Sequence, residues 1–184
     1  KFNYIFGELA VNDVYKYILF PVMNFDAKFS DIDKHNKEMA KKIKSTFPNV
    51  NNDSVLCIQV FEHYFKLRTL KEYIIENYKN FVTIHWRILC FQILYALYKF
   101  QKIYTGFRHN MLDLDSIYVY HKSESDKDTQ IKIGNVNFQI PNMGFEIKIT
   151  NFYNSVVEGV IKNKNASKTK ENQYYDTFYV FQSL

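Results

Sequence analysis

Hydrophobic and polar residues alternate with two different periods along this chain, and the period indicates which element to expect at each place. Apolar side chains at helical spacing in residues 8–24 predict a helix, which Pro21 should end near Phe20. A more polar segment follows, with a short helix expected over 36–46. Pro, Asn and Asp then cluster at 48–53, which is typical of a turn.

The middle of the chain carries the signals expected for a core. The continuous apolar run 55–61 predicts a buried strand. Thr69, with Glu72 three residues later, has the capping-box pattern that begins a helix. From 83 to 104 apolar residues cover most of the helix circumference, which predicts a buried helix closed by Gly106.

Alternation with a period of two dominates the region after the buried helix. A strand is expected at 117–120, and two or three more over 131–149. Residues 162–173 are rich in Lys, Asn, Ser and Thr and are expected to be mobile. The aromatic run 174–184 is expected to begin a helix, so the chain as a whole mixes helices and strands.

The overall composition is that of a globular protein, with 47% hydrophobic and 23% charged residues. The net charge of +5 is spread along the chain. Its densest cluster, 37–44, is interpreted as a solvated helix face and not as a nucleic-acid patch. No apolar stretch approaches the roughly 18 residues of a membrane span. We therefore expect neither a specific nucleic-acid partner nor a membrane span.

Cysteine and aromatic usage add little chemistry. Cys57 and Cys90 each lie in an apolar run without metal-ligand spacing, which predicts buried free thiols in a reducing compartment. We attribute the 17 Phe and 15 Tyr to the codon bias of an AT-rich genome and not to an aromatic binding surface. Because no Met precedes Lys1, we expect a fragment of a longer protein.

The polar loop 107–117, between the buried helix and the strand that follows, carries the most informative motif. Its residues 109–116, HNMLDLDS, resemble the catalytic loop H-R-D-L-x-x-x-N of protein kinases. Other segments match the same family in the same order. They are 55–62 for the strand leading to the hinge, 83–104 for the long central helix, 150–153 for the D-F-G turn and 174–176 for the start of the next helix.

The likeness narrows to one group of kinase-like proteins. The opening His109-Asn110, the hairpin residues 140–145 and the phrase 147–150 are similar to kinase-like proteins of large nucleocytoplasmic DNA viruses. In that group the loop reads close to H-N-D-L-H-x-x-N-I. The resemblance therefore implies a viral protein.

The resemblance also implies a fold and a domain organisation. The expected fold is α+β and protein kinase-like, with a mostly helical C-lobe that carries β-hairpins and an N-lobe that is partial or truncated. Residues 1–62 would form the partial N-lobe and residues 63–184 the partial C-lobe. Phe61, Glu62 and His63 would form the hinge that contacts a nucleotide, if one binds.

Three positions at which kinases carry their chemistry are replaced. Phosphoryl transfer uses an Asp that orients the substrate hydroxyl, and an Asn and an Asp that hold Mg²⁺. The resemblance puts Met111, Ser116 and Asn151 at these positions. A thioether accepts no proton, a hydroxyl is a poorer metal ligand, and a neutral amide lacks the charge that a hard cation prefers. We therefore assign no catalytic residue and no metal ligand.

Two carboxylates leave an alternative open. Asp113 and Asp115 lie in the same loop and would be the substitutes in an active enzyme, whereas a solvent-facing or backbone-capping role is the simpler expectation. His109, Phe152 and Asp176 are expected to be scaffold residues. Asp176 would either accept hydrogen bonds from the loop backbone or only compensate charge at a helix N-terminus.

The leading hypothesis is a catalytically inactive kinase-like protein, a pseudokinase, that serves as a structural or protein-binding module, for example in a virus particle. It implies no cofactor, other viral structural or replication proteins as partners, and a location in the host cytoplasm or the virion. The alternative is a divergent active serine/threonine kinase that uses ATP and Mg²⁺. A third hypothesis is an unrelated α+β interaction protein.

Overall fold

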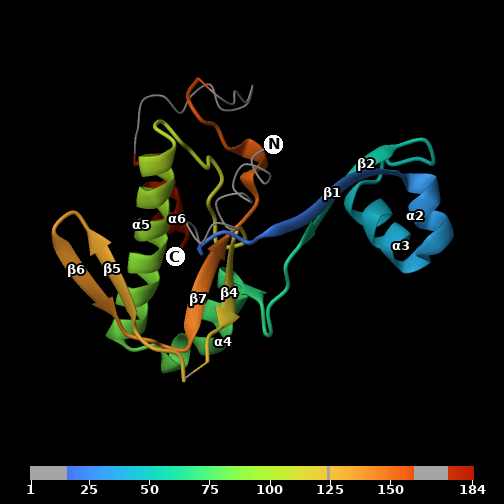
Figure 1. The fold of residues 1–184 in the computed structure, drawn as a ribbon. Coiled ribbons are helices and arrows are strands. Elements are labelled where there is room, and N and C mark those ends of the chain that lie inside the picture. Colours follow the sequence, from blue (N-terminus) through green and yellow to red (C-terminus); the bar gives the residue numbers. More distant parts are fainter. Residues whose placement is uncertain (1–15, 124, 160–173) are drawn as a thin grey trace. The chain divides into compact units, whose positions relative to one another are not determined.

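The computed structural model describes residues 16–123, 125–159 and 174–184 (Figure 1). These residues form two compact units. Unit 2 comprises Phe20–Glu62, and unit 1 contains the described residues on either side of it. The mixture of helices and strands is compatible with the α+β class expected from the sequence.

A small antiparallel sheet lies in the middle of unit 1. Its strands are β3 (Arg68–Thr69), β4 (Ile117–His121) and β7 (Phe145–Ile149), in the order β3-β4-β7. At the outer edge of β7, Ile18 forms a parallel bridge to Ile149. The amide of Leu19 donates to the carbonyl oxygen of Ile149 at 3.1 Å. The segment just before unit 2 is therefore joined to the edge of this sheet by a single β-bridge.

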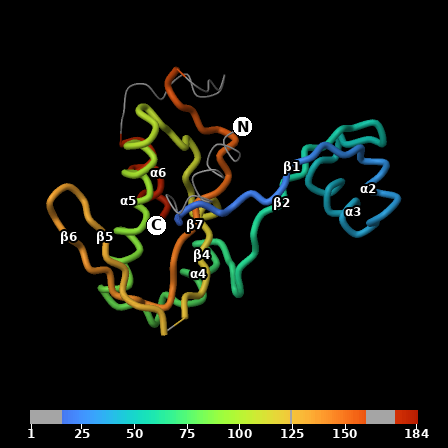
Figure 2. Tube along the Cα trace, viewed as in Figure 1, coloured from blue at the N-terminus to red at the C-terminus, as the bar shows by residue number. Residues whose placement is uncertain are grey.

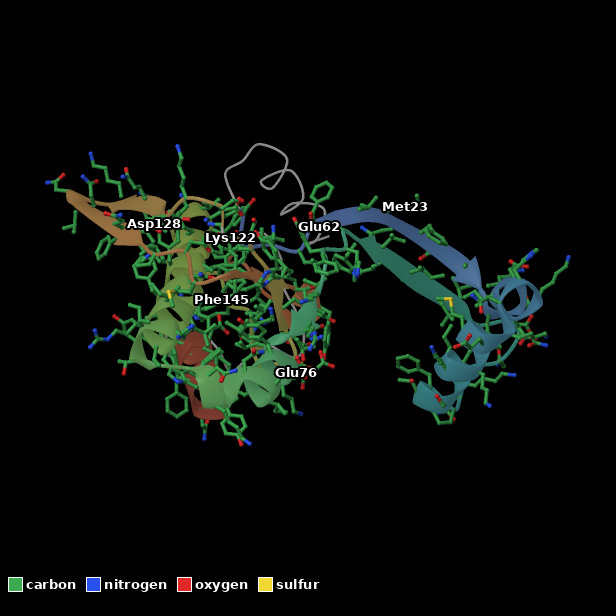
Figure 3. All side chains as sticks on the ribbon, turned by 90° about the horizontal axis from the view of Figure 1, so that it is seen from below. Met23, Glu62, Glu76, Lys122, Asp128 and Phe145 are labelled. Atoms are coloured by element: carbon green, nitrogen blue, oxygen red, sulfur yellow. The ribbon has the colours of Figure 1, made fainter. Side chains whose placement is uncertain are left out.

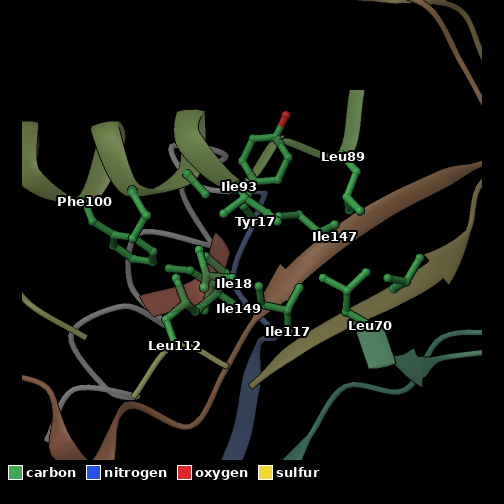
Figure 4. Close-up of a cluster of buried hydrophobic side chains, with 14 of the residues drawn as sticks. Tyr17, Ile18, Leu70, Leu89, Ile93, Phe100, Leu112, Ile117, Ile147 and Ile149 are labelled. Carbon is green, nitrogen blue, oxygen red and sulfur yellow. The ribbon is translucent and has the colours of Figure 1, made fainter. Parts of the chain in front are cut away.

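Helix α5 (Thr83–Ile103) lies against one face of this sheet and forms the core of unit 1 with it. Figure 4 shows Leu89, Ile93 and Phe100 of the helix close to side chains of the sheet. The helix expected over 83–104 is thus confirmed. It is not buried all round, because residues on its other side, among them Leu94, are exposed.

The capping box expected at Thr69 is confirmed. Glu72 N donates to Thr69 Oγ1 at 3.2 Å, and Thr69 N donates to Glu72 Oε2 at 3.0 Å. These two bonds satisfy amides that the helix itself cannot bond, and helix α4 (Leu70–Asn77) begins there. The short 3₁₀ helix η1 (Tyr78–Asn80) then leads into α5.

The remaining strands of unit 1 lie in the region where the alternation predicts them, and a helix begins in the aromatic run 174–184 as expected. Strands β5 (Thr129–Ile133) and β6 (Val136–Ile140) form a hairpin, and its Phe138 ring lies 5.5 Å from that of Phe91 on α5. The 3₁₀ helix η2 (Phe152–Asn154) follows β7, and helix α6 (Tyr175–Ser183) ends the chain. Residues 162–173, expected to be mobile, lie outside the described residues.

Helix α5 ends at Ile103 and is not closed by Gly106 itself, which follows three residues later with φ of +73°, a conformation that other residues rarely adopt. A Cβ added at Gly106 would lie 2.9 Å from Glu158 Cβ. We therefore expect Gly106→Ala to lower the free energy of unfolding by about 2 kcal/mol or more. Gly134→Ala is the matched control, because Gly134 also has positive φ (+58°) but no atom within 4 Å. It should cost only about 1 kcal/mol. Equal losses in urea denaturation would show that the contact with Glu158 is unimportant.

Unit 2 is a two-stranded ribbon with a pair of helices at its end. Strand β1 (Pro21–Lys28) pairs antiparallel with β2 (Val55–Phe61), and Figure 2 traces the chain out along β1 and back along β2. Between them lie α2 (Phe29–His35) and α3 (Lys37–Thr46). Asn36 caps α3 by accepting from Met39 N at 2.9 Å. The helix expected over 36–46 is confirmed, and its lysines are exposed as expected.

The helix expected to run to Phe20 is wrong over its described part. Residues 8–15 lie outside the described residues, whereas Lys16 and Tyr17 form a turn and Ile18 pairs with β7. Pro21 then begins β1 and does not end a helix. The segment is extended here because the Leu19 amide donates to the Ile149 carbonyl and the Tyr17 carbonyl accepts from the Ile149 amide. Tyr17–Leu19 therefore belong to unit 1, whereas the resemblance implied that they form one partial N-lobe with the rest of residues 1–62.

The strand at 55–61 is present but is not buried, which is a second correction. Every side chain of β2 is at least partly exposed, as is every one on β1, including Met23, which is 54% exposed (Figure 3). A two-stranded ribbon has open faces unless another layer covers them. For the same reason Cys57 is exposed, and Cys90 on α5 is only half-buried, so neither is the buried thiol expected.

Within the described ranges, no helix combines the length and the apolar character needed to cross a membrane.

Candidate functional site

The loop 107–117 is fixed at both ends by buried apolar side chains. Phe107, Leu112 and Ile117 are fully buried in the core of unit 1. Arg108 forms an antiparallel bridge with Val156, which ties the loop to the segment after η2. The loop is therefore held as part of the core, even though most of the remaining loop residues are polar.

Asp176 on α6 holds the backbone of this loop. Its two carboxylate oxygens accept from His109 N at 2.7 Å and from Asn110 N at 2.8 Å. The side chain is almost completely buried, 1% exposed. The residues that each bond joins are at least 66 positions apart in the sequence. Asp176 therefore makes the backbone contacts that one of the two sequence hypotheses assigned to it.

His109 is completely buried and bonds to the turn at residues 150–153. Its Nε2 donates to the Thr150 carbonyl oxygen at 2.8 Å, because a carbonyl can only accept. Its ring centroid lies 5.1 Å from that of Phe152. Burial lowers the pKa of His109, and this outweighs the opposing effects of the Thr150 carbonyl and of Asp176. The imidazole is therefore neutral and structural.

The pKa of His109 predicts a pH-dependent stability. The unfolded chain takes up a proton on this residue near pH 6.5, whereas the folded protein does so only at lower pH. The free energy of unfolding should therefore fall as the pH drops below about 6.5, with a slope approaching about 1.4 kcal/mol per pH unit, and should be independent of this residue above that pH.

Urea denaturation between pH 7.5 and 5.5 tests this slope. The variant His109→Gln should be less stable overall but should lose the slope. The control His35→Gln, at an exposed position, should keep the wild-type profile. A slope that persists in His109→Gln would show that another group causes it.

Met111, Ser116 and Asn151, which the kinase resemblance puts at the three chemical positions, lie together in the structure. Ser116 Oγ donates to the Met111 carbonyl oxygen at 2.9 Å, and Asn151 Nδ2 donates to Ser116 Oγ at 3.2 Å. Met111 Sδ accepts from Tyr153 Oη at 2.9 Å and from Asn154 Nδ2 at 3.2 Å. We call Met111, Ser116 and Asn151 the neutral cluster, because none of them carries a charge.

Two asparagines give this region its backbone shape. Asn110 and Asn151 both have φ of +66°, in the left-handed region that Asn tolerates better than most residues. Asn110 Nδ2 also donates to the Asn154 carbonyl oxygen at 2.8 Å, which joins the loop to η2. Sequence spacing gave no sign of the contacts of Tyr153 and Asn154, because they cross more than 40 residues.

Asp113 and Asp115 have different surroundings. Asp113 Oδ1 accepts from Ser116 N at 2.8 Å, so it caps the turn that leads into β4. Asp115 is exposed and lies 3.8 Å from the ammonium group of Lys71, which makes a weak surface ion pair. Only Asp113 therefore lies next to the neutral cluster.

The expected hinge residues divide between the two units. Phe61 and Glu62 end unit 2, where Glu62 Oε1 accepts from Phe20 N at 2.7 Å, and His63 begins the return to unit 1. Among the described residues, no group of three or more His, Cys, Asp or Glu side chains could hold a metal ion.

Comparison with known proteins gives two relatives from one virus. No family model matches the chain. A protein of Acanthamoeba polyphaga mimivirus named "Putative serine/threonine-protein kinase R400" is 30% identical over 185 residues, which cover 94% of this chain and 38% of that protein. "Uncharacterized protein R402" of the same virus is 31% identical over 163 residues, which cover 86% of this chain and 17% of that protein.

The chain is homologous to R400 over most of its length. This agrees with the expected likeness to serine/threonine kinase-like proteins of large DNA viruses. The chain spans less than half the length of either relative.

Proposed function

We propose that this chain is a protein kinase-like module that has lost phosphoryl transfer and acts as a structural or protein-binding component, that is, a pseudokinase. The observation that carries the proposal is the neutral cluster. The homology to R400 supports the kinase-like part of the proposal. The retained scaffold around His109 and Asp176 supports a fold kept for its shape.

The neutral cluster lacks what phosphoryl transfer needs. Orienting and deprotonating the attacking hydroxyl contributes roughly 10²- to 10⁴-fold to the rate, and a thioether at Met111 supplies neither. A hard divalent cation prefers carboxylate oxygens, whereas Asn151 offers a neutral amide. The Ser116 hydroxyl already donates to Met111 and accepts from Asn151. We accordingly propose no ATP or Mg²⁺ as cofactor.

The viral relatives point to the setting of this function. Both similar proteins belong to a mimivirus. We propose that the chain works in the host cytoplasm or in the virus particle, and that its partners are other viral structural or replication proteins.

Transfer of labelled phosphate from ATP tests the proposal. The protein is incubated with ATP, Mg²⁺ or Mn²⁺ and generic protein acceptors, alongside the variant Asp113→Asn. We expect equal background incorporation in both, because neither would catalyse transfer. The variant keeps the oxygen that accepts from Ser116 N, so its fold should not change. Incorporation by the wild-type protein that disappears in Asp113→Asn would overturn the proposal.

One observation favours the second candidate, a divergent active kinase. The Asp113 carboxylate lies beside Ser116, at the edge of the neutral cluster. An active enzyme would use this carboxylate in place of Met111, and it would bind ATP with Mg²⁺. A rise in melting temperature with millimolar ATP and Mg²⁺, absent in Asp113→Asn, would support this candidate.

A further inference from the structure

A polar and aromatic cluster lies on the face of the β4–β7 sheet that is opposite the α5 core. Successive side chains of a strand point to opposite faces, so the partners Tyr120–Glu146 and Tyr118–Lys148 share this outer face. Glu146 and Lys148 are only 6% and 7% exposed. Buried charged groups need partners, and the partners here are Tyr120 on the same face and one side chain from each of the two segments that lead to and from unit 2.

Glu146 holds the connection that leads into unit 2. One carboxylate oxygen accepts from the Lys16 ammonium group and the other accepts from the Tyr120 hydroxyl. Burial, and next the hydrogen bond to Glu146, raise the pKa of Tyr120, so its hydroxyl keeps the proton that it donates. Directly after Lys16, the Tyr17 carbonyl oxygen accepts from Ile149 N at 2.7 Å.

Lys148 and Tyr120 hold the connection that returns from unit 2. The Lys148 ammonium group lies 5.0 Å from the centroid of the Tyr64 ring and 5.8 Å from that of Tyr120. The Tyr64 and Tyr120 rings stack with centroids 4.5 Å apart and planes inclined by 23°. Cation–π and stacking contacts of this kind strengthen when they are desolvated. Tyr64 lies four residues before β3, and Leu67 N donates to its carbonyl oxygen at 3.1 Å.

We propose that Tyr120, Glu146 and Lys148 form an anchor that fastens both connections of unit 2 to the sheet of unit 1. Tyr120 contacts Glu146, which binds Lys16, and also Lys148 and Tyr64. Its loss should therefore loosen both connections together. The apolar face of the same strands packs separately against α5, so release of the anchor leaves the core of unit 1 folded. All the residues of the anchor and its contacts belong to unit 1. The proposal is independent of phosphoryl transfer.

Amide hydrogen exchange measured residue by residue tests the anchor. In Tyr120→Leu, the amides of Leu19 and Leu67 should exchange about tenfold faster or more, while buried amides of α5 keep their rates. In Glu146→Gln only Leu19 should accelerate strongly, and in Lys148→Met only Leu67. Tyr118→Leu is the matched control, because Tyr118 is half-buried on the same face of the same strand, and it should change neither rate.

Three outcomes would overturn the anchor. Exchange that accelerates at only one connection in Tyr120→Leu would show that the two halves are not coupled. Equal acceleration in α5 would show that the variant unfolds unit 1 as a whole. Unchanged rates at both Leu19 and Leu67 would show that the cluster fastens neither segment.

Discussion

Replacing Asp176 with alanine is expected to lower the free energy of unfolding by about 3–5 kcal/mol, as measured by urea or thermal denaturation. The substitution leaves the amides of His109 and Asn110 without their acceptor, and the His109 amide lies in a completely buried residue. Hydrogen bonds to a charged acceptor contribute more than neutral ones, and a buried unpaired donor carries its full desolvation cost. The loop 107–117 should lose its position relative to α6.

Two further variants separate the hypotheses for Asp176. If it only compensated charge at the start of α6, Asp176→Asn would cost about 0.3–1 kcal/mol. Since it accepts two amides, Asp176→Asn should cost about half as much as the alanine variant, because one amide oxygen replaces two carboxylate oxygens. Asp115→Ala, in the exposed part of the same loop, should change stability by less than about 0.5 kcal/mol. A small loss in Asp176→Ala would contradict the scaffold role.

The sequence predicted those parts of the fold that depend on local signals. The capping box of Thr69 and Glu72 lies within four residues of sequence. Helix α5 could be predicted from the spacing of its own apolar residues. The β5–β6 hairpin follows from alternation and turn residues. Each of these signals is satisfied within one element or between neighbouring elements, so no knowledge of the tertiary structure was needed.

Contacts between distant segments could not be read from spacing. Tyr17 and Ile18 have the apolar character of a helix, but the Tyr17 carbonyl accepts from Ile149 N and the Leu19 amide donates to the Ile149 carbonyl, more than 100 residues away, and this bridge decides their conformation. The contacts of Met111 Sδ with Tyr153 and Asn154 were missed for the same reason. The kinase resemblance named Met111, Ser116 and Asn151 separately, and the structure adds that they bond to one another.

The scaffold and the neutral cluster use different parts of the same loop. His109 and Asn110 offer their backbone amides to Asp176, whereas Met111 and Ser116 face Asn151 and η2. Changes at the neutral cluster therefore leave the bonds to Asp176 intact. Under the proposed loss of phosphoryl transfer, this separation would let the loop keep its backbone shape.

Phe152 begins η2, next to the neutral cluster, and its ring packs against His109 of the scaffold. Phe152→Ala should therefore lower the free energy of unfolding by about 3–5 kcal/mol. The side chain is 3% exposed, and its ring lies 5.7 Å from that of Phe100 and 5.1 Å from that of His109. The cavity left by the ring would border His109 and admit water, which would ease its protonation. The pH slope attributed to His109 should therefore become shallower in this variant.

The neighbouring residue provides the control for Phe152. Tyr153 is 64% exposed, so Tyr153→Ala should cost less than about 1 kcal/mol and should leave the pH slope unchanged. Denaturation of both variants at pH 7.5 and 5.5 gives the two quantities together. If Phe152→Ala loses stability but keeps the full slope, burial of His109 does not depend on this ring. If it costs no more than Tyr153→Ala, the ring is not part of the core that positions the loop.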